Sequence, residues 1–159
     1  MASCDLRDVV DEALKPIRDR LESDGFEVQV QVDENVPAID ADRTALVTAV
    51  SNLIENSAIF SEADRLIQIR AMRTNDQVCL SVEDHGIGMS KRDARRVFGR
   101  FYQVDTRLAR TSGGVGLGLS IVKGVADGHG GTCHVNSVLG EGSTFELCLP
   151  ISNSRGARA

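Results

Sequence analysis

In the first half of the chain, apolar residues recur either at the helical period or at every second position, and these two patterns predict helices and strands. Residues 6–23 are amphipathic at the helical period, and Pro16 is expected to kink or divide this helix. Residues 26–32 ("FEVQVQV") alternate strictly between apolar and polar, which is typical of a half-buried strand. After a predicted loop ("DENVPAID"), Asp42 is the expected N-cap of a long helix that ends at about Phe60.

The second half of the chain shows the same signals at shorter spacing. "LIQIRAM" and "QVCLSV" predict two strands joined by the turn "RTND", and the glycine-punctuated loop "EDHGIGMS" follows them. Ser90, with Asp93 three residues later, forms a pattern similar to a capping box and predicts the start of a short helix. Residues 104–115 lack periodicity and are expected to be a mobile loop, and residues 117–126 form a helix that stops at "DGHGG". "TCHVNSV" and "TFELCLP" then predict a closing hairpin around "LGEGS".

The order of these elements predicts an α+β fold. Strands adjacent in sequence are mostly hairpins, and the regular alternation of doubly wound parallel folds is missing. We therefore expect a two-layer α/β sandwich, in which a mixed, mostly antiparallel five-stranded sheet carries about three helices on one face. The domain is expected to span residues 1–150, and residues 151–159 are expected to be a disordered tail.

Composition and charge exclude several classes of protein. A chain of 159 residues with 42% hydrophobic and 26% charged residues suits one soluble globular domain. The net charge of -5 argues against a nucleic-acid-binding surface. No apolar run approaches the length of about 20 residues that a membrane span needs, and the first residues show no signal-peptide pattern. We expect a cytoplasmic domain that contacts neither nucleic acid nor membrane.

The cysteines are scattered along the chain. Cys4, Cys79, Cys133 and Cys148 show no CxxC spacing. This distribution favours reduced structural thiols over a metal site or a disulfide framework.

Two asparagines share one stripe of the helix that follows Asp42. At about 100° per residue, Asn52 and Asn56 fall roughly opposite the apolar arc, and Ile59 falls beside them. Asparagine is unfavourable inside a helix because its amide competes with the backbone. The stripe is therefore either a solvated polar face or a ligand-binding face, since an amide oxygen suits a hard cation such as Mg²⁺. The apolar arc consists of Leu46, Val50, Leu53, Ile54 and Ser57.

Two glycine-rich segments are candidate ligand loops. In "EDHGIGM", Gly86 and Gly88 permit close approach of the backbone, and the Asp84 carboxylate could accept a hydrogen bond from an amine such as that of adenine. "GGVGLGLS" is neither a Walker P-loop nor a Rossmann fingerprint, because it has neither Gly-Lys-Ser/Thr nor the GxGxxG spacing. It places backbone amides at a helix N-terminus, which favours an anion, although flexible helix packing would need the same glycines.

Together these segments resemble the catalytic ATP-binding domain of bacterial sensor histidine kinases, within the gyrase, Hsp90, histidine kinase and MutL (GHKL, or Bergerat-fold) ATPases. "NLIENSAIFS" is similar to the N box, "VEDHGIGM" to the G1 box and "VFGRFYQVD" to the F box. "GGVGLGLSIVKGVADGHGG" is similar to the G2 box, and "GEGSTFELCLP" to the closing hairpin. The resemblance covers about residues 6–150.

The resemblance implies roles for individual residues. Asn56 matches the catalytic asparagine that ligates Mg²⁺ on the ATP phosphates, and Asn52 would assist it from one turn earlier. Asp84 matches the aspartate that recognises the adenine amino group, and Gly86 and Gly88 would let their loop close over the base. The other implied nucleotide contacts are Phe60, Arg100, Gly114, Gly116, Leu117 and Gly118. Residues 104–115 correspond to the ATP lid.

One position separates two types of reaction. In the ATP-hydrolysing relatives, a glutamate one turn before the metal asparagine activates water, and here that position is Asn52. Glu55 is adjacent to Asn56 and points about 100° away from it. Without a placed base, attack by water is slow, whereas a histidine acceptor is itself the nucleophile. The resemblance therefore implies a protein histidine kinase that donates the γ-phosphate of Mg-ATP to a histidine on a separate domain.

Two departures from the family pattern leave alternatives open. Ile59 stands where the N box usually has a lysine, and Gln103 stands where the F box commonly has an arginine. Both lost residues are cations near the phosphates, where phosphoryl transfer needs electrostatic stabilisation. Arg100, Arg107 and Arg110 are candidates to replace them. One alternative is a degenerate, non-catalytic module that senses nucleotide or docks a protein, and another is a serine kinase of the anti-sigma type.

None of the three histidines lies in an H-box sequence. His85 is in the G1 loop, and His129 and His134 are expected to be structural. The expected partner is therefore the dimerisation and histidine-phosphotransfer domain of the same full-length kinase, and a response regulator would be reached indirectly. A position in the cytoplasmic part of a membrane-bound sensor is compatible with this role.

Overall fold

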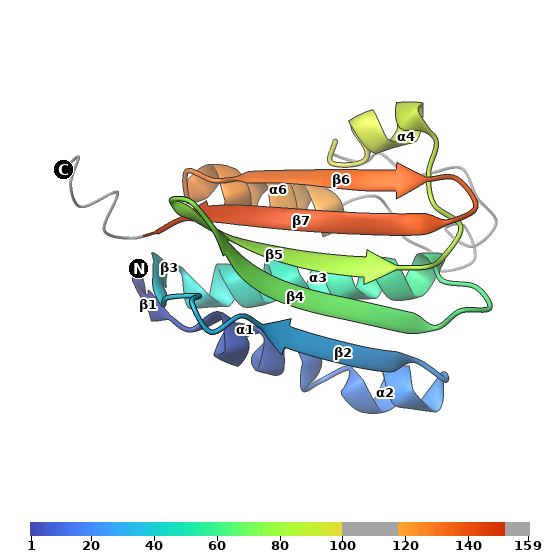
Figure 1. Ribbon diagram of the computed structural model, residues 1–159, viewed down its shortest axis with the longest axis horizontal. Helices are drawn as coiled ribbons and strands as arrows, with labels where there is room; N and C mark the ends of the chain where they lie inside the picture. Colours follow the sequence, from blue (N-terminus) through green and yellow to red (C-terminus); the bar gives the residue numbers. More distant parts are fainter. Residues whose placement is uncertain (100–117, 152–159) are drawn as a thin grey trace.

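Five strands form one sheet that is covered by helices on one face (Figure 1). The computed structural model describes residues 1–99 and 118–151, so the expected mobile loop at 104–115 and the tail at 152–159 lie outside the described residues. The strand order is β2 (Glu27–Val32), β4 (Leu66–Thr74), β5 (Gln77–Asp84), β7 (Gly142–Pro150) and β6 (Thr132–Val138). β2 and β4 run parallel, and the other neighbours are antiparallel. The predicted two-layer sandwich is confirmed.

The helix layer consists mainly of α1 (Leu6–Leu14), α3 (Arg43–Phe60) and α6 (Gly118–Gly128). Pro16 divides the first predicted helix, and a short second helix, α2 (Arg18–Ser23), follows it. α3 begins as expected, because the Asp42 side chain accepts a hydrogen bond of 3.1 Å from the Ala45 N–H. Ser90 caps α4 (Lys91–Arg96) in the same way through the Asp93 N–H. No helix in the described residues is long and apolar enough to cross a membrane.

The core lies between the sheet and the helices. The predicted apolar arc of α3 is buried along its whole length, including Ser57. Among the described residues, the largest fully buried side chain is Phe145 of β7. Strand alternation turns every second residue of β5 and β7 to the opposite face, which none of α1, α3 and α6 covers.

His129 joins the end of α6 to the beginning of α3. The Asp42 N–H donates a 3.0 Å hydrogen bond to Nε2 of His129, and Nδ1 of His129 lies 2.8 Å from the Val125 carbonyl oxygen. This arrangement requires the proton on Nδ1. Because His129 is 6% exposed and both of its ring nitrogens are engaged, it is structural, as predicted.

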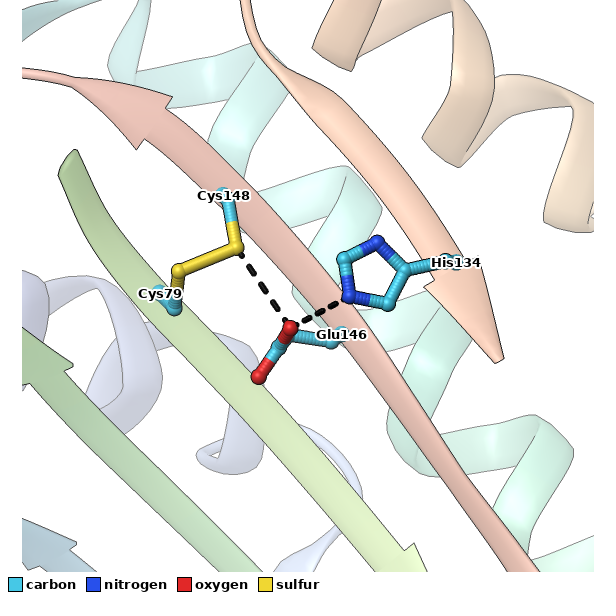
Figure 2. A network of polar contacts seen from close by, with 4 residues as sticks. All are labelled: Cys79, His134, Glu146 and Cys148. Carbon is cyan, nitrogen blue, oxygen red and sulfur yellow. Dashed lines mark hydrogen bonds and ion pairs between the residues drawn. A yellow bond between two sulfur atoms is a disulfide. The ribbon is translucent and has the colours of Figure 1, made fainter. Parts of the chain in front are cut away.

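Three sequence-based expectations need correction. The end of the expected loop forms a strand, β3 (Ile39–Ala41), which pairs with β1 (Ala2–Cys4); strands of three residues are too short to show a period. Ile151, assigned above to the tail, is 6% exposed and its N–H donates to the Asp76 carbonyl oxygen. The third correction concerns the cysteines: Cys79 and Cys148 form a disulfide, whereas Cys4 and Cys133 are free (Figure 2). The pair is 69 residues apart in sequence, and only the register of β5 with β7 brings it together.

Candidate functional site

The motifs meet where β5 ends, beside the C-terminal part of α3 and the hairpin that joins β6 to β7. Asp84, the last residue of β5, is 2% exposed. Its Oδ1 accepts a hydrogen bond of 3.0 Å from the Gly86 N–H and one of 3.3 Å from the Ser143 N–H. Two backbone donors from different segments therefore hold the carboxylate in one orientation.

The environment of Asp84 has opposing effects on its charge. Burial raises the pKa of Asp84 above its ordinary value, because a buried carboxylate loses hydration. The backbone donors of Gly86 and Ser143, the Ser57 hydroxyl and the charge of His85 lower the pKa again, and burial outweighs them. The Asp84 carboxyl group is therefore buried away from water, and hydrogen bonds to the backbone hold it in place.

Two polar atoms at this position lack a hydrogen-bond partner among the described residues. They are Asp84 Oδ2 and Ser57 Oγ, and both are buried. The Ser57 hydroxyl faces the carboxyl closely enough to lower its pKa, yet neither atom makes a hydrogen bond of normal geometry. Because buried polar groups in proteins are almost always paired, such atoms indicate a partner from outside the chain.

The G1 loop is held against its surroundings by glycines. A Cβ at Gly86 would lie 1.9 Å from the Phe60 carbonyl oxygen at the end of α3, and the Ile87 N–H donates to that same oxygen at 3.0 Å. Gly88 has a φ of +68°, and a Cβ there would lie 2.1 Å from the Val138 carbonyl oxygen. Both glycines therefore serve the packing of the loop between α3 and the hairpin.

The hairpin contributes residues that sequence reasoning missed. Ser143 donates its backbone N–H to Asp84, and a Cβ at Gly142 would lie 2.2 Å from the Asp84 carbonyl oxygen. Both belong to the quoted "GEGST" segment, but their contact with Asp84 depends on the pairing of β5 with β7. Ser57 was also missed as a site residue; a hydroxyl on an otherwise apolar helix arc was the available signal.

The N box and the start of the G2 helix also lie together. Asn52 and Asn56 are half-buried on α3, and no hydrogen bond joins either amide to another described residue. A Cβ at Gly118, the first residue of α6, would lie 3.4 Å from Asn52 Oδ1. Two amide groups without a partner in the described part of the chain thus lie on one helix stripe, and that of Asn52 lies against the beginning of α6. Phe60 ends α3 and packs against the core.

Glu55 points away from the asparagines, as expected. Its carboxylate forms an ion pair with Arg20 of α2. Ile59 lines a hollow of about 420 Å³ on the same side, together with Glu55, Phe26 and Arg65. Arg65 stacks on the Phe26 ring with its guanidinium carbon 5.0 Å from the centroid.

Residues 100–105 of the F box and residues 113–117 of the G2 segment lie outside the described residues. This applies to the expected contacts Arg100, Gly114, Gly116 and Leu117, and to Gln103, Arg107, Arg110 and residues 104–115. The first phenylalanine of the F box is described: Phe98 packs edge-on against Phe145, with ring centroids 6.3 Å apart. Lys123 of α6 forms an exposed ion pair with Asp127 one turn later.

Known proteins are similar to this chain in sequence and in fold. Residues 41–153 match the family of histidine kinase-, DNA gyrase B- and HSP90-like ATPases. The chain is 40% identical over 152 residues to the sensor-like histidine kinase SenX3 of Mycobacterium tuberculosis, an alignment that covers 94% of this chain and 36% of SenX3. The chain therefore spans about a third of the length of that relative.

Solved structures agree with this likeness. The structure of the mycobacterial sensor histidine kinase MprB superimposes with a TM-score of 0.79 at 28% identity, covering 94% of this chain and 97% of that one. Full-length ShkA in complex with AMPPNP superimposes with a TM-score of 0.82 at 28% identity, covering 95% of this chain and 31% of that one. The chain therefore belongs to the histidine kinase-, DNA gyrase B- and HSP90-like ATPase family, and it corresponds to the catalytic ATP-binding domain of sensor histidine kinases.

Proposed function

We propose that this domain binds Mg-ATP between α3, the G1 loop and the beginning of α6, and that the γ-phosphate goes to a histidine on another domain of the same kinase. The observation that carries the proposal is the buried Asp84 carboxylate, whose Oδ2 lacks a partner beside the equally unpaired Ser57 hydroxyl. Family membership supports the nucleotide, and the AMPPNP named for ShkA is an ATP analogue.

Asp84 is the proposed adenine-recognition residue. An exocyclic amine can donate to Asp84 Oδ2, since Oδ1 is already occupied by the Gly86 and Ser143 donors. The Ser57 hydroxyl can donate in the opposite direction, to a ring nitrogen or to a bridging water. This donor and acceptor pair favours adenine over guanine, which presents a carbonyl oxygen where adenine has its amine.

Asn56 and Asn52 are the proposed residues for the metal and the phosphates. Amide oxygens suit Mg²⁺, which commonly takes only one or two protein ligands and completes its shell with phosphate oxygens and water. Both amides are unengaged within the described ranges, so the donor set fits this ion. When bound, Mg²⁺ would neutralise charge on the phosphates. The backbone amides that open α6 at Gly118 supply a positive helix end on the same side.

The residues around Asn56 support transfer to histidine over hydrolysis. The position one turn before Asn56 is Asn52, whose amide cannot act as a general base. Glu55 is engaged with Arg20. We propose that the acceptor histidine belongs to the dimerisation and histidine-phosphotransfer domain, because His129 is buried with both nitrogens bound and His134 is paired with Glu146. A response regulator would receive the phosphoryl group from that domain.

Calorimetric titration of the chain with ATP tests the proposal. We expect binding in the presence of Mg²⁺, weaker binding when Mg²⁺ is chelated, and loss of this metal dependence in Asn56→Ala. Asp84→Asn is expected to weaken ATP binding by about 10–100-fold, the effect of leaving one buried hydrogen bond unmade. Glu83→Gln is the matched control, because the neighbouring acid lies on the opposite face of β5.

Two results would overturn the proposal. One is the absence of ATP binding at millimolar nucleotide, which would favour the degenerate docking module. The other is equal ATP affinity of wild type and Asp84→Asn. Incubation with radiolabelled ATP and the separately expressed dimerisation domain then tests transfer, and label on serine would support the anti-sigma type of kinase. The relatives reported above carry histidine kinase names and do not favour these alternatives.

A further inference from the structure

Four metal-ligating side chains gather on the face of the sheet opposite the helices, away from the nucleotide site (Figure 2). Cys79 of β5 and Cys148 of β7 are direct register partners, with their Cα atoms 4.1 Å apart. Their neighbours Val78, Leu80, Leu147 and Leu149 belong to the helix-covered core, so strand alternation places the two sulfurs on the other face. Both cysteines are 5% exposed or less.

Glu146 and His134 complete this group. Glu146 precedes Cys148 by two residues and therefore shares its face of β7, and His134 is the register partner of Glu146 on β6. Glu146 Oε1 lies 3.6 Å from Cys148 Sγ and also contacts Nε2 of His134. The Glu146 and His134 side chains are 28% and 50% exposed. The sulfurs thus form a buried floor, and the carboxylate and imidazole form a solvent-accessible rim.

We propose that, when the Cys79–Cys148 disulfide is reduced, these four side chains bind one Zn²⁺ ion. The ligand atoms of Cys79, Glu146 and Cys148 lie within 4.8 Å of one another. Ligands on a tetrahedral zinc ion are separated by about 3.3–3.8 Å, given bonds of about 2.0–2.3 Å. To reach that range, the two sulfurs must separate once their bond is broken, and the partly exposed Glu146 and His134 side chains must rotate toward them.

The type of ligand selects the type of ion. Two thiolates, one imidazole and one carboxylate form a soft to borderline set, which favours Zn²⁺ and disfavours Mg²⁺ or Ca²⁺. Three of the ligands carry negative charge once the thiols are deprotonated, so the ion offsets the repulsion that two thiolates and a carboxylate would otherwise have. The site is therefore distinct in chemistry from the proposed Mg²⁺ ligands on α3.

The oxidation state of Cys79 and Cys148 determines whether this site can bind metal, because the same two sulfurs form either the disulfide or the bonds to the ion. Two low-molecular-weight thiols reduce the Cys79–Cys148 bond and leave as one small disulfide, giving two protein thiols. Zn²⁺ then displaces one proton from each thiol. Oxidation by a small disulfide reverses the first step and releases the ion.

Zinc binding to the oxidised and the reduced chain tests the proposal. The disulfide is reduced with a phosphine, which becomes the phosphine oxide with oxygen from water. After anaerobic desalting, zinc is added and its content and affinity are measured by elemental analysis and by competition with a chromophoric chelator. We expect one Zn²⁺ per reduced chain and none retained by the oxidised chain. Co²⁺ should give the thiolate charge-transfer absorption of a sulfur-ligated site in the reduced chain only.

Variants identify the ligands. Cys79→Ser and Cys148→Ser should lose the site, and Glu146→Gln and His134→Ala should weaken zinc binding by about 10–100-fold. Cys133→Ser is the matched control, because Cys133 lies on β6 but packs against the core on the other face. Cys133→Ser should therefore bind zinc like the wild type.

Circular dichroism checks that each variant is folded. The melting temperature of the wild type with and without zinc is a second measurement, which needs no variant. Zinc should raise the melting temperature of the reduced wild type but not of the oxidised wild type, because an ion that binds only the folded state stabilises it. Equal zinc retention by the reduced wild type and the folded Cys79→Ser variant would overturn the proposal. An unchanged melting temperature of the reduced wild type with zinc would also overturn it. Neither result would affect ATP binding at Asp84.

Discussion

Gly118, the first residue of α6, lies so close to Asn52 of α3 that a Cβ at position 118 would be 3.4 Å from Asn52 Oδ1. This contact joins the G2 segment to the N box, although 65 residues separate these positions in sequence (residues 53–117). The beginning of α6, where backbone N–H groups are unpaired within the helix, therefore faces the asparagine stripe.

The contact predicts graded effects of substitution at Gly118. An alanine Cβ at 3.4 Å makes an ordinary contact, so Gly118→Ala should bind ATP nearly as the wild type does. The extra carbons of valine would displace the Asn52 side chain, and Gly118→Val should lower ATP affinity by about tenfold, the effect of losing about one hydrogen bond. Calorimetric titration compares the two variants; equal affinities would show that Asn52 does not contribute to the site.

Gly86 is predicted to be needed for stability. A Cβ at this position would lie 1.9 Å from the Phe60 carbonyl oxygen, so Gly86→Ala must push the G1 loop away from α3 and should lower the free energy of unfolding by about 1–3 kcal/mol. Gly124→Ala in α6 is the control, since no atom lies within 4 Å of its Cβ position. That variant should gain about 0.5–1 kcal/mol from better helix propensity. Urea denaturation measures both, and similar stability changes would contradict the packing role of Gly86.

Asp84 is predicted to make stability depend on pH. Its folded-state pKa is raised above 3.8 by burial, so it contributes stability that is fully present below 3.8 and is lost as the pH rises through the folded-state pKa. An asparagine at position 84 does not ionise, so Asp84→Asn removes the loss of stability that accompanies rising pH. The variant should therefore be more stable than the wild type at pH 7, and the difference should shrink as the pH falls toward 3.8. Urea denaturation across this pH range checks the sign; a wild type that gains on the variant as pH rises would contradict it.

Ile59 tests whether a lost cation limits phosphate binding. Ile59→Lys should tighten ATP binding by about fivefold, because a partly exposed charge interaction is worth up to about 1 kcal/mol. AMP binding should change little, since the added charge would act on the outer phosphates. Ile59→Met controls for the change in shape. If ATP and AMP respond equally, or ATP binds more weakly, the lysine instead joins the Arg20–Glu55 pair that lines the same hollow.

Local sequence determined the elements and the family. Helix and strand periods depend on neighbouring residues, so α3 with its Asp42 cap, the division at Pro16 and the strands β2, β4, β5, β6 and β7 were all predictable. The N, G1 and G2 boxes also identified Asn52, Asn56, Asp84 and the glycines as candidates, because each motif lies within one short segment.

Tertiary structure decided how distant segments complete the site. The Ser143 donor reaches Asp84, and Cys79 meets Cys148, only because β5 pairs with β7 in one particular register. If β7 were shifted by one residue against β5, its side chains would point to the opposite face, and neither contact would form. Ser57 became a site residue because packing of α3 on the sheet brings its hydroxyl to the Asp84 carboxyl. The sequence by itself thus supplied the chemical groups, and the pairing of strands and the packing of helices, which depend on contacts between distant residues, determined their partners.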